Sequence, residues 1–110
     1  MLGLFKKTKA YNNVKAQEFE QLLQEKNTVL LDVRTADEFR AGHIKGAKNI
    51  DYFSSFKSKI SQLDKDKHYL LYCRSGARSS NACQLMTEAG FEHLSNLSGG
   101  IGAWRGPIAQ

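Results

Sequence analysis

The sequence predicts an α/β domain built on a mainly parallel sheet with helices on both faces. Two continuous apolar runs, at residues 28–33 and 68–73, lack the polar alternation of half-exposed strands. Such runs are typical of parallel strands that are buried on both faces. Segments with helical spacing of apolar residues alternate with the strands, and this alternation favours helical crossovers between parallel strands. The 110 residues correspond to one domain of ordinary size.

The first half of the chain contains clear start and stop signals. We expect an edge strand at 11–14, a helix at 16–24, a strand at 28–33, a short helix from 36, and a further strand entered at 46–50. Thr35 is a suitable N-cap for the short helix, with Glu38 at the capping-box position. Gly42 is expected to end that helix.

The second half follows the same order. Phe53, Phe56 and Ile60 predict a helix, residues 68–73 a strand, 78–89 the longest helix, and 94–97 a short strand. Gly90 is expected to stop the longest helix. The face of this helix that is expected to be buried carries Ala82, Cys83, Met86 and Ala89.

The charge pattern indicates neither a nucleic-acid-binding nor a membrane protein. The net charge is +5, but the lysines form no basic stripe interleaved with aromatic residues, so we read them as a solvated surface. No apolar run approaches the length of a membrane-spanning helix.

Residues 1–9 are expected to form a mobile arm before a domain at 10–110. They lack the pattern of a signal peptide, and we therefore expect a cytoplasmic location.

The two cysteines, Cys73 and Cys83, have different expected roles. In a reducing compartment a disulfide between them is not expected, and the scattered histidines make a poor zinc site, so the sequence indicates no metal or cofactor. Cys83 lies on the apolar face of the helix at 78–89, where we expect a structural core residue rather than a resolving cysteine. Cys73 ends a buried strand and is the candidate nucleophile.

The segment 73–78, CRSGAR, is the candidate site. It joins a strand to a helix at the carboxyl end of the sheet, where ligands bind in α/β folds. Gly76 permits a tight turn, and the backbone N–H groups of residues 74–78 can converge on an anion at the helix N-terminus. Arg74 and Arg78 add positive charge. These features favour the thiolate form of Cys73.

Three motifs in this order resemble the rhodanese (sulfurtransferase) family in its single-domain form. They are LLDVR at 30–34 with GHIKGA at 42–47, CRSGARS at 73–79, and LSGGIGAW at 97–104. Lys45 departs from the family, which commonly has proline there; the change concerns a turn and no chemistry. The resemblance spans nearly the whole chain and implies a rhodanese-like fold with a central parallel sheet of about five strands.

The resemblance also implies a mechanism. Cys73 would take the outer sulfur of a donor such as thiosulfate, become a persulfide, and pass that sulfur to an acceptor, which is cyanide in the assay or a thiol in the cell. The loop residues Arg74, Ser75, Gly76, Ala77 and Arg78 are the expected substrate-binding residues. We expect structural roles for the charged residues of the first motif, Asp32, Arg34, Glu38 and His43. Gly99 and Gly100 are expected to supply positive φ or close backbone approach, and Trp104 is expected to be a core anchor.

Two other function classes stay open at this point. A phosphatase of the Cdc25 type or an arsenate reductase would share the fold, but cysteine phosphatases place five residues between cysteine and arginine, and this chain has four. A persulfide carrier for a protein partner, such as a thioredoxin-like protein, would use the same residues. The sequence does not choose among thiosulfate, mercaptopyruvate and protein persulfides as donors, and it does not indicate the oligomeric state.

Overall fold

The computed structural model describes residues 11–110 and contains a five-stranded, wholly parallel sheet in the order β1-β6-β5-β2-β4. The elements in chain order are β1 (Tyr11–Val14), α1 (Ala16–Leu22), β2 (Thr28–Asp32), α2 (Ala36–Ala41), β3 (His43–Ile44), β4 (Lys48–Asn49), α3 (Phe56–Ile60), β5 (His68–Tyr72), α4 (Ala77–Glu88), β6 (Leu94–Leu97), the 3₁₀ helix η2 (Gly100–Ala103) and β7 (Ile108–Ala109). The predicted fold class is confirmed. The predicted arm at 1–9 lies outside the described residues.

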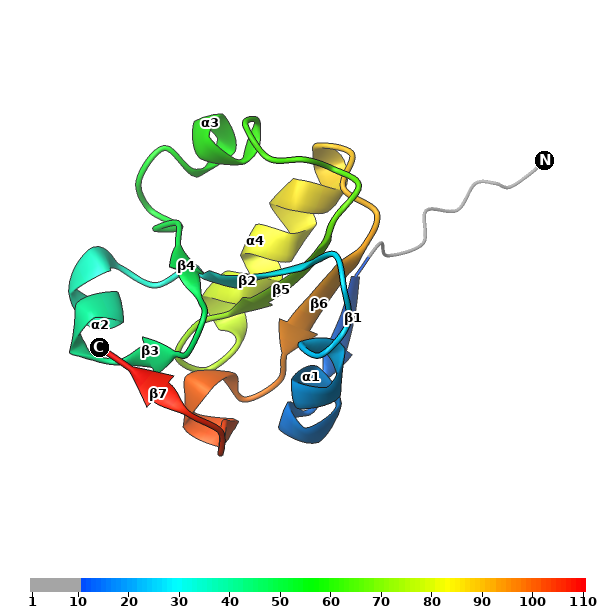
Figure 1. Ribbon diagram of the computed structural model, residues 1–110. Coiled ribbons are helices and arrows are strands. Elements are labelled where there is room, and N and C mark those ends of the chain that lie inside the picture. The colour runs from blue at the N-terminus through cyan, green and yellow to red at the C-terminus, as the bar shows by residue number, and fades with distance from the viewer. Residues whose placement is uncertain (1–10) are drawn as a thin grey trace.

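Helices cover both faces of the sheet (Figure 1). Alternate side chains of the central strand β5 point to opposite faces, because successive residues of a strand do so. Tyr69 and Leu71 join the core beneath α3 and α4. Leu70 and Tyr72 join a second core beneath α1. This second core also contains Trp104. The continuous apolar run at 68–73 is therefore explained by burial on two sides.

Several local signals are confirmed. The side chain of Thr35 accepts a hydrogen bond from the Glu38 amide, and the Glu38 side chain accepts one from the Thr35 amide, which completes a capping box on α2. Gly90 follows α4 with φ of +100°, a conformation that favours glycine. Trp104 is buried and packs edge-to-face on Phe19, with ring centroids 6.2 Å apart.

Other predictions were wrong at the ends of elements. Phe53 lies outside α3 and is 71% exposed, because the chain turns through Ser55 in the left-handed region before the helix begins. Ala89 is exposed, since α4 ends at Glu88 and the chain then leaves the buried face; Phe91 packs into the core instead.

A small antiparallel pair, β3 with β7, was not predicted. Each of its strands has two residues, which is too short to show a period. Among residues 11–110, no helix combines the length and apolar character that crossing a membrane requires.

Candidate active site

Cys73 lies directly after β5, and α4 begins at Ala77, so the loop between them is at the carboxyl end of the sheet. Gly76 is the N-cap residue of α4 and has φ of +109°, a conformation that side chains disfavour. The turn brings the sulfur of Cys73 under the first turn of the helix. The sulfur there takes the place of an N-cap side chain, since it accepts one of the free amides of that turn.

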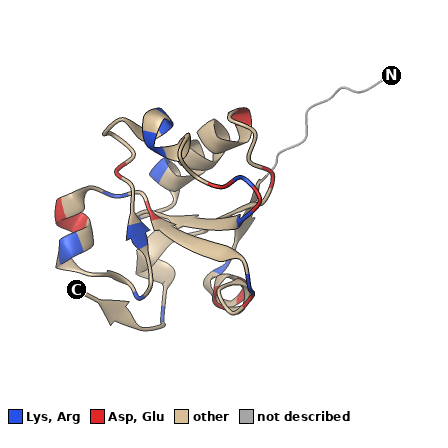
Figure 2. Cartoon of the chain, turned by 45° about the horizontal axis from the view of Figure 1, so that its top comes forward, with Lys and Arg blue, Asp and Glu red and all other residues tan. Residues whose placement is uncertain are grey.

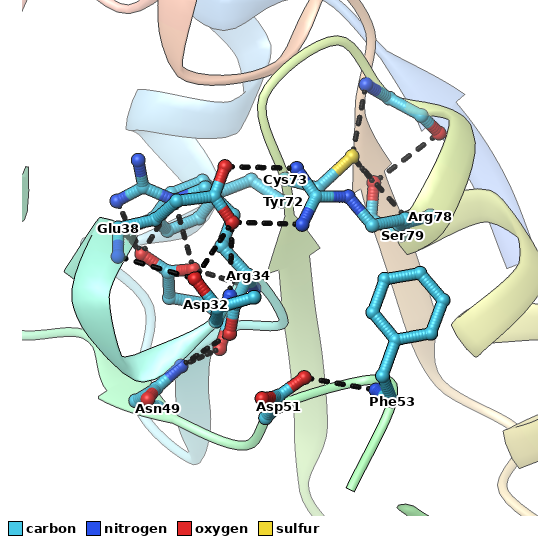
Figure 3. A network of polar contacts seen from close by, with 12 residues as sticks. Asp32, Arg34, Glu38, Asn49, Asp51, Phe53, Tyr72, Cys73, Arg78 and Ser79 are labelled. Atoms are coloured by element: carbon cyan, nitrogen blue, oxygen red, sulfur yellow. Dashed lines mark hydrogen bonds and ion pairs between the residues drawn. The ribbon is translucent and has the colours of Figure 1, made fainter.

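Several hydrogen bonds converge on the sulfur of Cys73 (Figure 3). The Gly76 amide donates at 3.1 Å, and the amide and hydroxyl of Ser79 each donate at 3.4 Å. Cys73 itself is 1% exposed. Burial alone would raise the pKa of its thiol, but the hydrogen bonds from Ser79, Gly76 and Ser75 outweigh burial and lower that pKa below its ordinary value. The arrangement stabilises a thiolate.

Ser79 was missing from the predicted set of binding residues. We expected the amides of residues 74–78 to form the cradle, and Ser75 and Gly76 do contribute. Ser79 contributes both an amide and a hydroxyl, because it is the third residue of α4 and its side chain turns back toward the N-terminus. The first turn of a helix has free amides that point away from the helix, and this rule could have identified the residue.

The two arginines of the loop occupy different environments. Arg78 donates to both carboxylate oxygens of Glu38, at 2.8 and 3.1 Å. This bond, followed by that from the Thr35 amide, lowers the pKa of Glu38 to about 2. Arg74 is exposed. The guanidinium charge of Arg78 is therefore largely balanced by Glu38, whereas Arg74 presents its charge to solvent. Figure 2 shows the other cationic residues spread over several elements, including α2, β4 and α3.

A buried polar network supports the strand ends next to the loop. Asp32 and Arg34 form a salt bridge of 2.7 Å, and the hydroxyl of Tyr72 donates to the same Asp32 oxygen at 2.6 Å. Tyr72 also accepts the Ile44 amide at 3.0 Å. Burial and then the bond to Asp32 raise the pKa of Tyr72. Because Tyr72 immediately precedes Cys73, this network fixes the point from which the loop departs. The structure pairs Asp32 with Arg34, which agrees with the structural role expected for both residues.

The third motif packs directly against the loop. The Ile101 amide donates to the Cys73 carbonyl at 2.9 Å. Gly100 has φ of +63°, and a Cβ atom added to it would lie 2.2 Å from the Arg74 carbonyl oxygen. Both reasons expected for glycine here, positive φ and close approach, are confirmed.

The two other candidates are His43 and Cys83, for which we expected structural roles. The His43 ring bonds the Phe39 carbonyl at 2.8 Å and stacks on the Phe39 ring, with centroids 3.7 Å apart. Cys83 is completely buried, and burial raises the pKa of its thiol to about 12. Both cysteines are free. Within the described range, residues 11–110, His, Cys, Asp and Glu side chains form no group of three or more that could hold a metal ion.

Comparison with known proteins shows which protein family this chain is related to. Residues 15–107 match the model of the rhodanese-like domain. The chain is 30% identical over 95 residues to the thiosulfate sulfurtransferase GlpE of Shewanella oneidensis, with 86% of this chain and 93% of GlpE covered. A rhodanese-like domain from the Anabaena protein Alr3790 superimposes with a TM-score of 0.79 at 31% identity, over 88% of this chain and 77% of that one.

Some relatives are longer than this chain. The uncharacterized protein YqhL of Bacillus subtilis is 40% identical over 79 residues, which are 72% of this chain and 62% of YqhL. A tRNA uridine(34) hydroxylase of Onion yellows phytoplasma is 38% identical over 90 residues, which cover 77% of this chain and 29% of the hydroxylase. From the matched domain, the three motifs and the shared fold, it follows that this chain belongs to the rhodanese-like domain family, whose members include sulfurtransferases.

Proposed function

We propose that this protein moves a sulfane sulfur from a small anionic donor, such as thiosulfate, to a thiophilic acceptor through a persulfide on Cys73. The observation that carries the proposal is the convergence of the Gly76 amide and of the amide and hydroxyl of Ser79 on one buried sulfur. These donors favour a thiolate, which is the nucleophilic form of cysteine. The same preorganised donors can stabilise charge that develops on sulfur during transfer.

The reaction has two displacements. In the first, the Cys73 thiolate attacks the outer sulfur of thiosulfate; the new S–S bond forms, the bond between the two thiosulfate sulfurs breaks, and sulfite leaves with the electron pair. In the second, cyanide or a thiolate attacks the outer sulfur of the persulfide, and the electron pair of the broken bond returns to Cys73. No cofactor is needed for this electron balance. The exposed charge of Arg74 would attract the anionic donor toward the loop.

The loop length supports sulfur over phosphate chemistry. Four residues separate Cys73 from Arg78, and Arg78 has both of its terminal nitrogens engaged by Glu38. A Cdc25-type phosphatase or an arsenate reductase would need this arginine to face the substrate anion.

A persulfide carrier for a thioredoxin-like partner uses the same Cys73 chemistry, with a protein thiol as acceptor. Two free cysteines fit a reducing, cytoplasmic location.

The test is intact-protein mass spectrometry after incubation with thiosulfate, mercaptopyruvate or a persulfide donor. We expect a gain of one sulfur atom on wild-type protein and none on Cys73→Ser, together with loss of thiosulfate-to-cyanide transfer in that variant. Transfer activity that survives Cys73→Ser would refute the assignment. If the persulfide forms but only a protein thiol removes its outer sulfur, this protein acts as a persulfide carrier for a protein partner.

A further inference from the structure

The buried hydroxyl of Ser79 has one proton and two acceptors. Its oxygen lies 3.4 Å from the sulfur of Cys73 and 3.3 Å from the carbonyl oxygen of Gly76 (Figure 3). Ser79 is completely shielded from solvent. Since a serine hydroxyl donates only one hydrogen bond, it can donate to the sulfur or to the carbonyl, and rotation of the hydroxyl hydrogen alone changes its acceptor.

The carbonyl of Gly76 stays bonded in either state. It also accepts the Ser80 amide at 3.0 Å and the side-chain amide of Asn96 at 3.4 Å. Asn96 is itself held by a hydrogen bond to Asn13 at 2.9 Å. When the Ser79 hydroxyl turns to the sulfur, the carbonyl therefore keeps two donors and is not left unpaired in a buried site. The choice of acceptor then depends on the charge of the sulfur.

That charge changes during the proposed sulfur transfer. A thiolate is a strong, charged acceptor, whereas the inner sulfur of a persulfide is neutral and accepts weakly. We propose that Ser79 is a catalytic hydrogen-bond donor, whose hydroxyl bonds to the Cys73 thiolate and turns to the Gly76 carbonyl while the persulfide is present. This role rests on the proposed function.

The two displacements then depend on Ser79 in different ways. In persulfide formation the sulfur of Cys73 loses its charge, so the hydroxyl acts mainly through the fraction of protein that carries a thiolate. In persulfide discharge the bond between the two sulfurs breaks, and the electron pair returns to Cys73. The hydroxyl stabilises this developing charge in the transition state. A role limited to holding the loop in place would affect both displacements alike.

The first experiment measures the thiolate without any sulfur transfer. The rate of Cys73 alkylation by iodoacetamide is followed from pH 5 to 10, with the modified peptide identified by mass spectrometry. For Ser79→Ala we expect about tenfold slower alkylation at the acidic end and a profile moved to higher pH, because a hydrogen bond to a charged group is lost. The matched control is Ser80→Ala, whose hydroxyl contacts Tyr11 at 3.1 Å and which should retain the wild-type profile. An unmoved profile in Ser79→Ala would overturn the proposal.

The second experiment separates the two displacements by rapid mixing, with thiosulfate for persulfide formation and cyanide for discharge. For Ser79→Ala we expect formation to approach the wild-type rate at high pH, and discharge to stay about tenfold slower at every pH. Equal slowing of both displacements at all pH values would indicate a displaced loop and contradict the proposal. If wild-type protein accepts no sulfur, the proposed function fails, and alkylation alone then decides whether Ser79 stabilises the thiolate.

Discussion

Replacement of Glu38 by glutamine tests the ion pair that joins α2 to the active-site loop. The carboxylate accepts hydrogen bonds from both terminal nitrogens of Arg78. It also accepts one from the Thr35 amide, which caps α2. Its pKa falls from 4.5 to about 2, which corresponds to roughly 3 kcal/mol of favourable interaction. The paired side chains are 23% and 26% exposed, and solvent screening reduces this value to about 2 kcal/mol. Glutamine keeps an oxygen for the cap, so we expect Glu38→Gln to lower the free energy of unfolding by about 1.5 kcal/mol at pH 7.

The stability difference between wild type and Glu38→Gln should decrease as the pH falls. Because the pKa of Glu38 is lowered on folding, its contribution is complete above about pH 5 and is lost as the pH falls toward 2. Urea unfolding of wild type and Glu38→Gln should therefore differ most at neutral pH, and the difference should shrink in acid. Asp37→Asn is the matched control, since Asp37 pairs with Arg40 on the exposed side of the same helix and should change little. A difference that is constant from pH 7 to 3 would refute the reasoning.

Two further substitutions test the packing around the site. Gly100→Ala places a methyl group 2.2 Å from the Arg74 carbonyl at a φ of +63°, so we expect a loss of about 2–4 kcal/mol in the free energy of unfolding and slower Cys73 alkylation. Gly102→Ala, which meets open space, is its control; equal stability of the two variants in urea would contradict the close approach. Cys83→Ala should retain most sulfur-transfer activity at a cost of about 1 kcal/mol in unfolding. A large loss of turnover at unchanged stability would instead indicate a resolving cysteine.

Local patterns predicted most of the fold. The apolar runs at 28–33 and 68–73 correspond to the neighbouring strands β2 and β5, because burial on two faces leaves no place for polar alternation. The capping box on α2 was predicted in full, since its two residues are three positions apart and interact within one helical turn. Errors occurred where a pattern ends. Phe53 has suitable spacing but precedes the first residue of α3, and Ala89 lies beyond the last residue of α4.

Some parts of the candidate site were predicted from the sequence, and others were not. Cys73 and the turn at Gly76 followed from the order strand, glycine, helix, which by itself places a sulfur near helix amides. The two arginines looked equivalent in the sequence, but within residues 11–110 Arg78 forms an ion pair, with Glu38, and Arg74 forms none. Ser79 was missed because the donors were assigned to the loop alone, whereas the first helical turn also faces the sulfur.

The sequence by itself determined the parallel α/β order, the position of Cys73 between a strand and a helix, and the family motifs. These properties depend on residues that are close in the chain. The tertiary structure decided the partners of the charged groups: Glu38 with Arg78, and Tyr72 with Asp32, each 40 positions apart. It also decided the contact of Gly100 with the carbonyl of Arg74. The physical reason is that such pairs form only after sheet register and helix packing have brought separate segments together, and no local pattern specifies which of several suitable partners will be within reach.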